Sequence, residues 1–546
     1  MKYLQHIIFF IGFLNVCFAQ APVIEWQKRY GGNGYDGLGP PLQTMDGGYL
    51  FVGGSTSMAS FDKTQDVCSS KDIWLVKTNS IGEMQWQQNI GGNRLDSCTD
   101  IKQLPDGGYL VLAQSYSAPT CNNTVSTLPL IQFGGDVLEP FSWLLRLDSL
   151  GNILWQRAYE GSPGKMYPQP NGDFYVLGSV FNMPPIPPDD YLGRSDAQMT
   201  QEAPVYTMTD IKIFKIDAQG NVLWSKVIIG DSYDGAHKMF FTNDGNMILV
   251  GSSTSGIGFD KTEASLMTDI WVFKINASGT ILWQKTLGGN ATEGLIDCKL
   301  DSDQNIRLTI QSNSGISGNR TVPLLSNYPD SDVWRVLMSS NDGEILSQDS
   351  FAFIQTPGLP QSRYLYEMPD FSGYYAMCTK TLSEDDTDIY ISQLDLNGNI
   401  VWERTFGGDG RDGGFLLPNG NDGFFVCGSS NSGISGDKTS TAHDEYGDAW
   451  IIKLRPATLG SNVISTFSTA LISPNPTTGF VNIKFGRYYD RINVSITNVL
   501  GQVIQNETIT NANNYNYTII DAIGLYFVKI QDATNGGEKV FKIIKN

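Results

Sequence analysis

The sequence has little of what most catalytic or nucleic-acid-binding sites need. It contains three histidines in 546 residues, and one of them, His6, lies close to the N-terminus. Basic residues are scarce: 37 Lys and Arg stand against 56 Asp and Glu, a net charge of −19, which argues against a basic face for nucleic acid. A hydrophobic fraction of 41% and 58 glycines indicate a turn-rich chain that can still form cores. The composition favours a β-rich binding or structural protein over an enzyme.

Residues 1–19 have the pattern of a signal peptide. Lys2 gives a short positive region, residues 7–16 form an apolar core, and Ala19 offers a small residue for cleavage before Gln20. No later segment approaches the roughly eighteen apolar residues of a membrane span. We therefore expect export through the periplasm and no transmembrane segment after signal removal. The mature chain would keep 36 basic and 56 acidic residues, a net charge of −20.

Cysteine spacing gives no metal or redox motif, because no Cys-x-x-Cys is present. Export permits disulfides. Cys68 and Cys121 lie in polar, loop-like segments, so they are the one pair that we expect to be bonded. The remaining mature cysteines lie in apolar, strand-like runs and are expected to be buried thiols: Cys98, Cys298, Cys378 and Cys427.

One unit of sequence recurs seven times. An Asp/Asn-x-x-Gly turn followed by a strand with tryptophan appears in Asp148–Trp155, Asp217–Trp224 and Asp395–Trp402. In one degenerate copy Ser347 replaces the tryptophan. The seven anchor positions are 26, 86, 155, 224, 283, 347 and 402, with spacings of 55 to 69 residues.

Each unit contains four short strands linked by turns, which predicts an all-β, seven-bladed β-propeller over residues 20–455. The phase of the repeat adds a second prediction. The chain begins with one lone strand, Val23–Arg29, while the last unit ends near Leu454 after three strands. The first strand should therefore complete the last blade and close the ring. All eleven tryptophans fall at repeated positions, so we expect them to pack blade against blade.

Acidic residues recur in the glycine turns that follow the tryptophan strands. Placed around a ring, they would face the channel entrance, where carboxylates could bind Ca²⁺. A second interpretation is that each accepts hydrogen bonds from its own turn, and it is the one we favour. No loop has the EF-hand pattern, and no other cofactor is indicated. The calcium candidates are Asp36, Asp96, Asp234 and Asp412, with Glu293 at the same position.

After a predicted linker at 456–469, residues 470–546 change to short β runs that predict a small Ig-like sandwich. Four ordered motifs occur in this segment, and their characteristic residues are Pro474, Asn475, Pro476, Gly479, Gly501, Gly524, Tyr526 and Lys542. Together these motifs resemble the type A C-terminal sorting domain of type IX secretion cargo in Bacteroidetes. The resemblance implies contact with the type IX machinery, passage through the outer membrane, removal of this domain, and release or attachment at the cell surface.

The repeats do not fit the enzyme motifs that are most similar to them. The spacing Asp148-x-x-Gly151-x-x-x-Trp155 does not fit a sialidase Asp-box, and it lacks the extra residue and threonine of a quinoprotein docking motif. Neither His237 nor His443 stands beside a Gly-x-Ser-x-Gly elbow. Paired carboxylates stay open as an alternative, because acids are plentiful and their distance in space cannot be seen in a sequence.

The most variable segments are the loops between the second and third strands of each unit, which in a propeller emerge on one face. Length variation on a rigid scaffold is typical of binding. We therefore predict a secreted or cell-surface binding or adhesion module whose loop-bearing face meets a glycan or another surface protein. The alternative is a secreted hydrolase that acts on polysaccharide or peptide. The seven loops are 55–71, 115–141, 179–209, 252–268, 311–331, 380–387 and 429–447.

Overall fold

The computed structural model divides the chain into two compact units, Met1–Ala457 and Thr458–Asn546, and each is described by itself. The predicted signal peptide, Gly501 and most of the predicted linker lie outside the described residues. These are 21–68, 71–125, 132–133, 137–138, 141–182, 208–326, 331–352, 364–368, 371–418, 423–456, 467, 470–499, 502–533 and 538–546.

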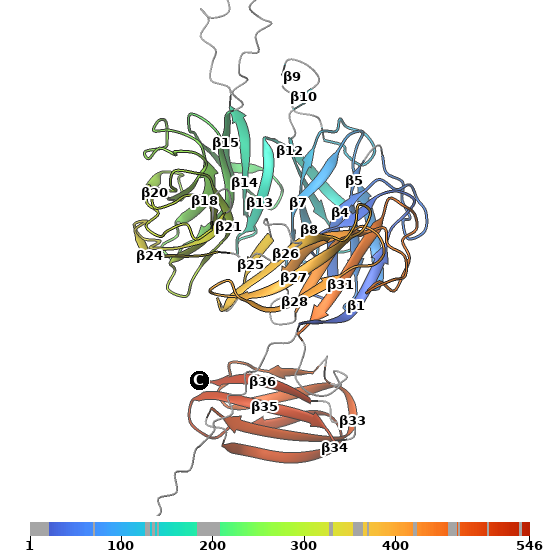
Figure 1. Cartoon of the computed structure of the whole chain (residues 1–546). Coiled ribbons are helices and arrows are strands. Elements are labelled where there is room, and N and C mark those ends of the chain that lie inside the picture. Colours follow the sequence, from blue (N-terminus) through green and yellow to red (C-terminus); the bar gives the residue numbers. More distant parts are fainter. Residues whose placement is uncertain are drawn as a thin grey trace, which may run out of the picture. The chain divides into compact units, whose positions relative to one another are not determined.

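The first unit is a ring of seven antiparallel sheets within the described residues, as the repeats predict (Figure 1). Each sheet is one blade, and the first strand of each blade contacts strands of the preceding blade. Blade 1 has β2 (Asp36–Leu38), β3 (Leu42–Gln43), β4 (Tyr49–Ser55), β5 (Asp72–Thr78) and β6 (Met84–Ile90); blade 2 has β7 (Asp96–Gln103), β8 (Tyr109–Ser115), β11 (Phe141–Leu147) and β12 (Ile153–Glu160); blade 3 has β13 (Ser162–Pro168), β14 (Phe174–Asn182), β15 (Met208–Ile216) and β16 (Val222–Ile228).

The remaining blades follow the same order, with the first-listed strand innermost. A separate hairpin, β9 (Gln132–Phe133) with β10 (Val137–Leu138), belongs to the long loop of blade 2. Blade 4 has β17 (Asp234–Phe241), β18 (Met247–Ser253), β19 (Asp269–Ile275) and β20 (Ile281–Leu287); blade 5 has β21 (Glu293–Leu300), β22 (Ile306–Ser312), β23 (Asp332–Met338) and β24 (Ile345–Ala352); blade 6 has β25 (Tyr364–Glu367), β26 (Gly373–Thr381), β27 (Thr387–Asp395) and β28 (Ile400–Phe406); blade 7 has β29 (Asp412–Pro418), β30 (Phe424–Ser430), β31 (Asp448–Arg455) and β1 (Val23–Tyr30).

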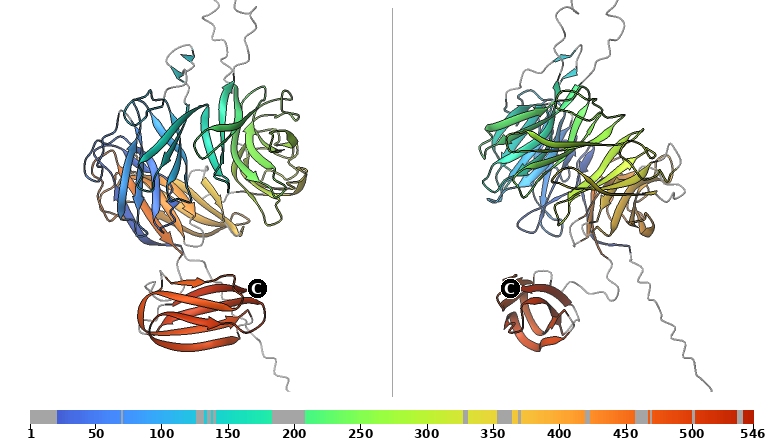
Figure 2. Two further views of the ribbon diagram at one scale, coloured as in Figure 1. Left: turned by 180° about the vertical axis from the view of Figure 1, so that it is seen from behind. Right: turned by 90° about the vertical axis from the view of Figure 1, so that its left-hand side faces the viewer.

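Strand β1 closes the ring, which confirms the prediction from the repeat phase. It pairs antiparallel with β31 from Val23 opposite Arg455 to Tyr30 opposite Ala449. In Figure 2 the blue start of the propeller lies against the orange end of the same ring. The outermost strand of blade 7 therefore comes from the opposite end of the propeller sequence, and it covers the edge of β31 and gives this blade its fourth strand.

Tryptophans pack blade against blade, as predicted. The third-strand tryptophans of five blades are buried at 0–2% exposure: Trp74, Trp143, Trp271, Trp334 and Trp450. Fourth-strand tryptophans cover the turn glycine of the next blade; a Cβ on Gly82 would lie 2.9 Å from Trp26, and one on Gly151 would lie 2.8 Å from Trp86. Both glycines also have positive φ. Glycine is therefore required twice at each position, by the conformation of the turn and by the close approach of the indole ring.

Blade 5 lacks this tryptophan. Ser347 stands at its position, and a cavity of about 200 Å³ is lined there by Ser347, Arg307, Arg335 and Leu396 of the next blade's turn. Phe351, four residues further along β24, covers Gly398 of that turn instead of an indole. The interface between blades 5 and 6 is therefore packed differently from the tryptophan-bearing ones.

The second unit is one five-stranded antiparallel sheet that folds over on itself. The hairpin of β33 (Phe480–Asn498) and β34 (Val503–Thr518) bends where its register breaks between Lys484 and Tyr489, so it contributes to both layers. Strand β32 (Leu471–Ser473) pairs with the first half of β33; β35 (Gly524–Asp532) pairs with the second half, and β36 (Glu538–Lys545) follows it. The right-hand view of Figure 2 shows these strands curving around one centre. Phe467, inside the predicted linker, is buried in this core.

If β1 closes the ring, its removal should destabilise the propeller. A chain that starts at residue 31 leaves β31 as an exposed edge and uncovers the apolar core of blade 7, so we expect it to aggregate or to melt far below a chain that starts at residue 21. Thermal melting and size-exclusion chromatography of the two proteins measure this. Equal melting temperatures and a monomeric profile for the shorter chain would show that β1 is dispensable.

Candidate functional site

The Gly-Gly pair that leads from one blade to the next locks the two blades together. Where blade 7 passes to blade 1, a Cβ on Gly31 would lie 2.0 Å from the carboxylate of Asp448, and one on Gly32 would lie 2.5 Å from Ser57. The first glycine therefore packs on the blade that the chain leaves, and the second on the blade that it enters. The same contacts recur at Gly91 with Asp72 and Gly92 with Ser117, Gly288 with Asp269 and Gly289 with Ser314, and Gly407 with Asp388 and Gly408 with Ser432.

The acids of the glycine turns lie inside these junctions. Asp36 is 0% exposed, and its Oδ2 accepts hydrogen bonds from the Gly32 amide and the Ser57 hydroxyl, both at 2.7 Å. The expectation that these carboxylates face the channel entrance is therefore wrong. Equivalent bonds to glycine amides or serine hydroxyls are made by Asp96, Asp234, Glu293 and Asp412, each also 0% exposed.

Calcium binding by these acids stays a prediction. Within the residues that the structure describes, no group of three or more His, Cys, Asp or Glu side chains is placed to hold a metal ion. An ion at Asp36, Asp96, Asp234 or Asp412 would have to enter a junction between two packed blades. The hydrogen bonds of these carboxylates are consistent with the second interpretation, in which each acid accepts hydrogen bonds from its own turn.

Each turn acid has a second carboxylate beside it, from the start of the third strand in the preceding blade. Burial raises the pKa of Asp269, and the neighbouring Glu293 adds to the shift. Burial likewise raises the pKa of Asp388 to about 6, with Asp386 and Asp412 as further causes. The junctions thus hold carboxylates whose protonation is favoured by loss of water and by a like charge.

A buried cation in the loop between the second and third strands offsets this negative charge. Lys261 is 1% exposed; its Nζ donates to Ser265 and Thr286 at 3.0 Å and lies 5.1 Å from the centre of the Trp271 ring. Burial lowers the pKa of such a lysine, to about 8 for Lys63, while nearby carboxylates oppose the shift. The cations that stand over the third-strand tryptophan are Lys63, Lys261, Arg320 and Lys438.

A tryptophan–glutamine pair ties the same loop to the outer strand. In blade 1, Trp74 Nε1 donates to Gln87 Oε1 at 3.0 Å, and Gln87 Nε2 donates to the carbonyl of Asp62 in the loop at 2.6 Å. Our sequence reasoning missed the glutamine, although it directly follows the repeated tryptophan. The other glutamines in this role are Gln156, Gln284, Gln348 and Gln27.

The tips of these loops are exposed and apolar. One tip position has a positive φ in five blades: Phe61, Cys121, Phe259, Gly318 and Gly436. Phe61 and Phe259 are 66% and 77% exposed, and the isoleucines two residues before 259, 318 and 436 are exposed as well. The Phe61 ring stacks on His443 of blade 7 with centroids 4.0 Å apart, so the loops of adjacent blades meet at this face.

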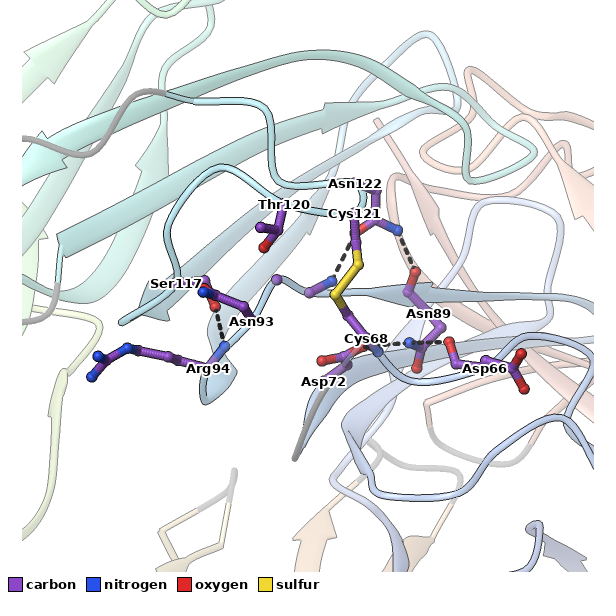
Figure 3. The surroundings of a disulfide bond; sticks show 12 residues. Asp66, Cys68, Asp72, Asn89, Asn93, Arg94, Ser117, Thr120, Cys121 and Asn122 are labelled. Atoms are coloured by element: carbon purple, nitrogen blue, oxygen red, sulfur yellow. Dashed lines mark hydrogen bonds between the residues drawn. A yellow bond between two sulfur atoms is a disulfide. The ribbon is translucent and has the colours of Figure 1, made fainter.

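Blade 2 departs from the charged pattern and carries the disulfide. Asn123 stands where the loops of blades 1, 4, 5 and 7 have Lys or Arg, and Phe141 stands where they have Asp. Cys121 of this loop is bonded to Cys68 of the blade 1 loop, which confirms the predicted pair (Figure 3). Around the bond, Asp72 accepts from the Cys68 amide at 2.7 Å, and Asn122 accepts from the Gly91 amide at 2.8 Å. Of the other cysteines, Cys298, Cys378 and Cys427 are buried and Cys98 is half-buried.

A cavity of about 460 Å³ lies at the mouth of the central channel. Its walls come from the first two strands of blades 1 and 7 and from Tyr364 and Thr379 of blade 6. The inner strands begin at this end of the ring, where the variable loops also emerge. The lining includes Tyr35, Lys71, Tyr364, Phe415 and seven glycines, and no carboxylate is among the described lining residues.

In the second unit, the sorting-motif residues gather at the last strand. Asn475 donates to the carbonyl of Lys542 at 2.8 Å and accepts from the Ile544 amide at 3.0 Å. Gly479 and Gly524 have φ of 136° and 153°, and Tyr526 is buried and donates to the carbonyl of Ala522. The Pro474–Pro476 segment thus covers the edge that β36 would otherwise expose.

Comparison with known proteins gives this unit a class. Residues 471–546 match the family described as the secretion system C-terminal sorting domain. The second unit is therefore a type IX sorting domain, as the motifs predict, and it directs export to the outer cell surface or secretion through contact with that machinery. No described helix is long or apolar enough to cross a membrane.

The similar solved structures are distant. A Dyadobacter fermentans protein of unknown function has 11% identity and a TM-score of 0.36, over 80% of this chain and 99% of that one. An ulvan lyase has 11% identity and a TM-score of 0.41, over 75% and 96%. PorZ, a surface component of the type IX secretion system of Porphyromonas gingivalis, has 10% identity and a TM-score of 0.26, over 95% and 100%. None of the curated proteins matches the chain.

The disulfide links the loops of blades 1 and 2, and the blade 2 loop is the one in which Asn123 replaces the buried cation. Replacement of Cys68 and Cys121 by serine removes a link between residues 53 positions apart, and we expect a loss of about 2–4 kcal/mol in the free energy of unfolding. Denaturant melts of both proteins, with and without reductant, measure it. Reductant should lower the stability of the wild type toward that of the variant and leave the variant unchanged. If the two proteins unfold at the same denaturant concentration without reductant, the link contributes nothing.

Asp388 gives a pH dependence with a definite sign. Its pKa is about 6 in the folded chain against an ordinary value near 3.8, so its contribution to stability is complete below about pH 4 and is lost as the pH rises through 6. Asp388→Asn stays uncharged at every pH and should melt higher than the wild type above pH 6, with the difference vanishing toward pH 4. Melting temperatures from pH 4 to 8 test this, and a variant that is less stable at pH 8 would contradict it.

Proposed function

We propose that the exported propeller is a binding module whose loop-bearing face recognises a glycan or another surface protein. The observation that carries this proposal is the conformation of Phe61 and Phe259. Both have positive φ, of 49° and 52°, which a residue with a side chain adopts only at a cost of about 1–2 kcal/mol. Because blades 5 and 7 have glycine at the same position, the fold itself does not require the ring.

Strained residues are usually stabilised by burial of their side chains, and the exposed Phe259 ring lacks that stabilisation. The Phe259 ring is 77% exposed, so burial in a core does not offset the cost of its backbone conformation. Strained residues that packing does not explain are typical of ligand contacts. Around them the loop is held by a buried cation, a tryptophan–glutamine pair and the carboxylates of the junction. A rigid base with exposed apolar tips supports recognition of a partner outside the cell.

The hydrolase alternative has less support. A glycosidase needs two carboxylates that reach the substrate, whereas the repeated acids are 0% exposed and hydrogen-bonded inside the blade junctions. The cavity at the channel mouth has no acid among its described lining residues. Binding is therefore the function that the geometry favours.

Phe61→Gly combined with Phe259→Gly tests the proposal. The variant takes the residue of blades 5 and 7, so strain is relieved at both positions. The greater freedom of glycine in the unfolded chain and the loss of the Phe61–His443 stack oppose this gain, and the variant should be about as stable as the wild type or more stable. Its binding to a glycan array and to intact bacterial cells should fall at least tenfold. The matched control is Leu223→Ser with Leu282→Ser, two side chains on outer strands that are 53% and 50% exposed, and this variant should bind as the wild type does. Unchanged binding by the phenylalanine variant would refute a role for the tips.

A further inference from the structure

We infer that the cavity at the channel mouth is a binding subsite for an uncharged saccharide. This inference rests on the proposed binding function and deepens it by naming one subsite and the class of its ligand. The cavity is formed where blades 6, 7 and 1 meet, at the loop-bearing end of the ring, and its volume of about 460 Å³ is in the range of small-ligand sites.

Glycine backbone forms much of the cavity surface. Gly37, Gly53, Gly413 and Gly428 are among the seven glycines that line it. Some are required by the fold, since a Cβ on Gly53 would lie 1.9 Å from the carbonyl of Gly37 in the neighbouring strand. Gly413 is different, because a Cβ there would meet nothing within 4 Å. The backbone at Gly413 is thus open to a ligand, and the fold alone does not exclude a side chain there.

Three exposed aromatic rings stand around this glycine surface. Tyr35, Tyr364 and Phe415 are 40%, 59% and 47% exposed. The Tyr364 and Phe415 rings meet edge to face, with centroids 5.9 Å apart, although they come from different blades. The face of an aromatic ring is apolar, and tyrosine also carries a hydroxyl group that forms hydrogen bonds. The C–H groups on one face of a sugar ring can pack on such an aromatic face. Thr379 and Ser429 add hydroxyl groups for the sugar's own hydroxyls.

The charge of the site favours an uncharged ligand. Lys71 is the single charged residue among the described lining, and its Nζ lies 5.7 Å from the centre of the Tyr35 ring, where it supports that ring. The chain as a whole has a net charge of −19. A polyanion would be repelled by this field, and one lysine does not reverse it. A neutral sugar carries no net charge, so this field does not weaken its binding.

The repeats provide matched controls for a test. Gly294 occupies the position of Gly413 in blade 5, and a Cβ there also meets nothing within 4 Å. Tyr233 occupies the position of Tyr35 in blade 4, and its hydroxyl likewise lies over the following Gly235. Neither Gly294 nor Tyr233 lines the cavity. A substitution at each pair therefore changes the same local structure inside and outside the proposed subsite.

The experiment measures binding of the purified full chain to neutral polysaccharides (β-glucan, xylan and galactomannan) and to acidic ones (alginate and pectate) by affinity electrophoresis and calorimetry. We expect at least one neutral polysaccharide to bind, with little dependence on salt. Gly413→Val and Tyr35→Ala should weaken that binding at least tenfold, while Gly294→Val and Tyr233→Ala stay within about twofold. Melting temperatures close to the wild type verify that each variant is folded.

The outcomes separate this inference from the proposed function. If a polysaccharide binds but Gly413→Val and Gly294→Val bind it equally, the cavity is not the subsite, and the binding function stands. Binding of acidic polysaccharides alone, with a loss in salt, would overturn the uncharged class. If none of the polysaccharides binds, the inference fails together with the glycan branch of the proposed function, and the protein-partner branch is left.

Discussion

The carboxylate buried between two blades is the contact on which the rest of the propeller depends. Each described turn acid accepts hydrogen bonds from a serine of its own blade, and Asp36 also accepts one from the Gly32 amide and lies beside Asp448 of the preceding blade. Glycine at both crossover positions lets the chain pass this close. Loss of the acid would leave buried donors without a partner, which is costly in a protein interior. A side chain in place of either glycine would collide with the neighbouring carboxylate or serine.

The same junction positions the face that we assign to binding. In blades 1, 4, 5 and 7 the loop cation lies near the junction acids and over the third-strand tryptophan, and a glutamine of the outer strand donates to a loop carbonyl. The polar groups that hold the loops are therefore buried beneath the loop tips. The exposed side chains at the loop tips and at the channel mouth need not stabilise the fold. The sorting domain directs the chain to the outer cell surface or to secretion, so the ligand that we propose is one found outside the cell.

Much of this architecture could be predicted from local patterns. The spacing of Trp155, Trp224 and Trp402 indicates the blades, and the phase of the repeat indicates that β1 closes the ring. The orientation of Asp36 could not be predicted, because it depends on how closely Gly31 and Gly32 approach residues of two different blades. The channel-mouth cavity is formed by Tyr35 and Phe415, which are remote in sequence, so no local motif marks it.

A crystal structure of the protein with a neutral oligosaccharide would test the binding face and the junctions together. We expect a closed ring, junction carboxylates such as Asp36 buried and metal-free, and sugar density at the channel mouth against Tyr35 and the open backbone of Gly413. Sugar bound only on the outer strands would contradict the assignment of the binding face. A cation between Asp36 and Asp448 would contradict the structural role of the turn acids.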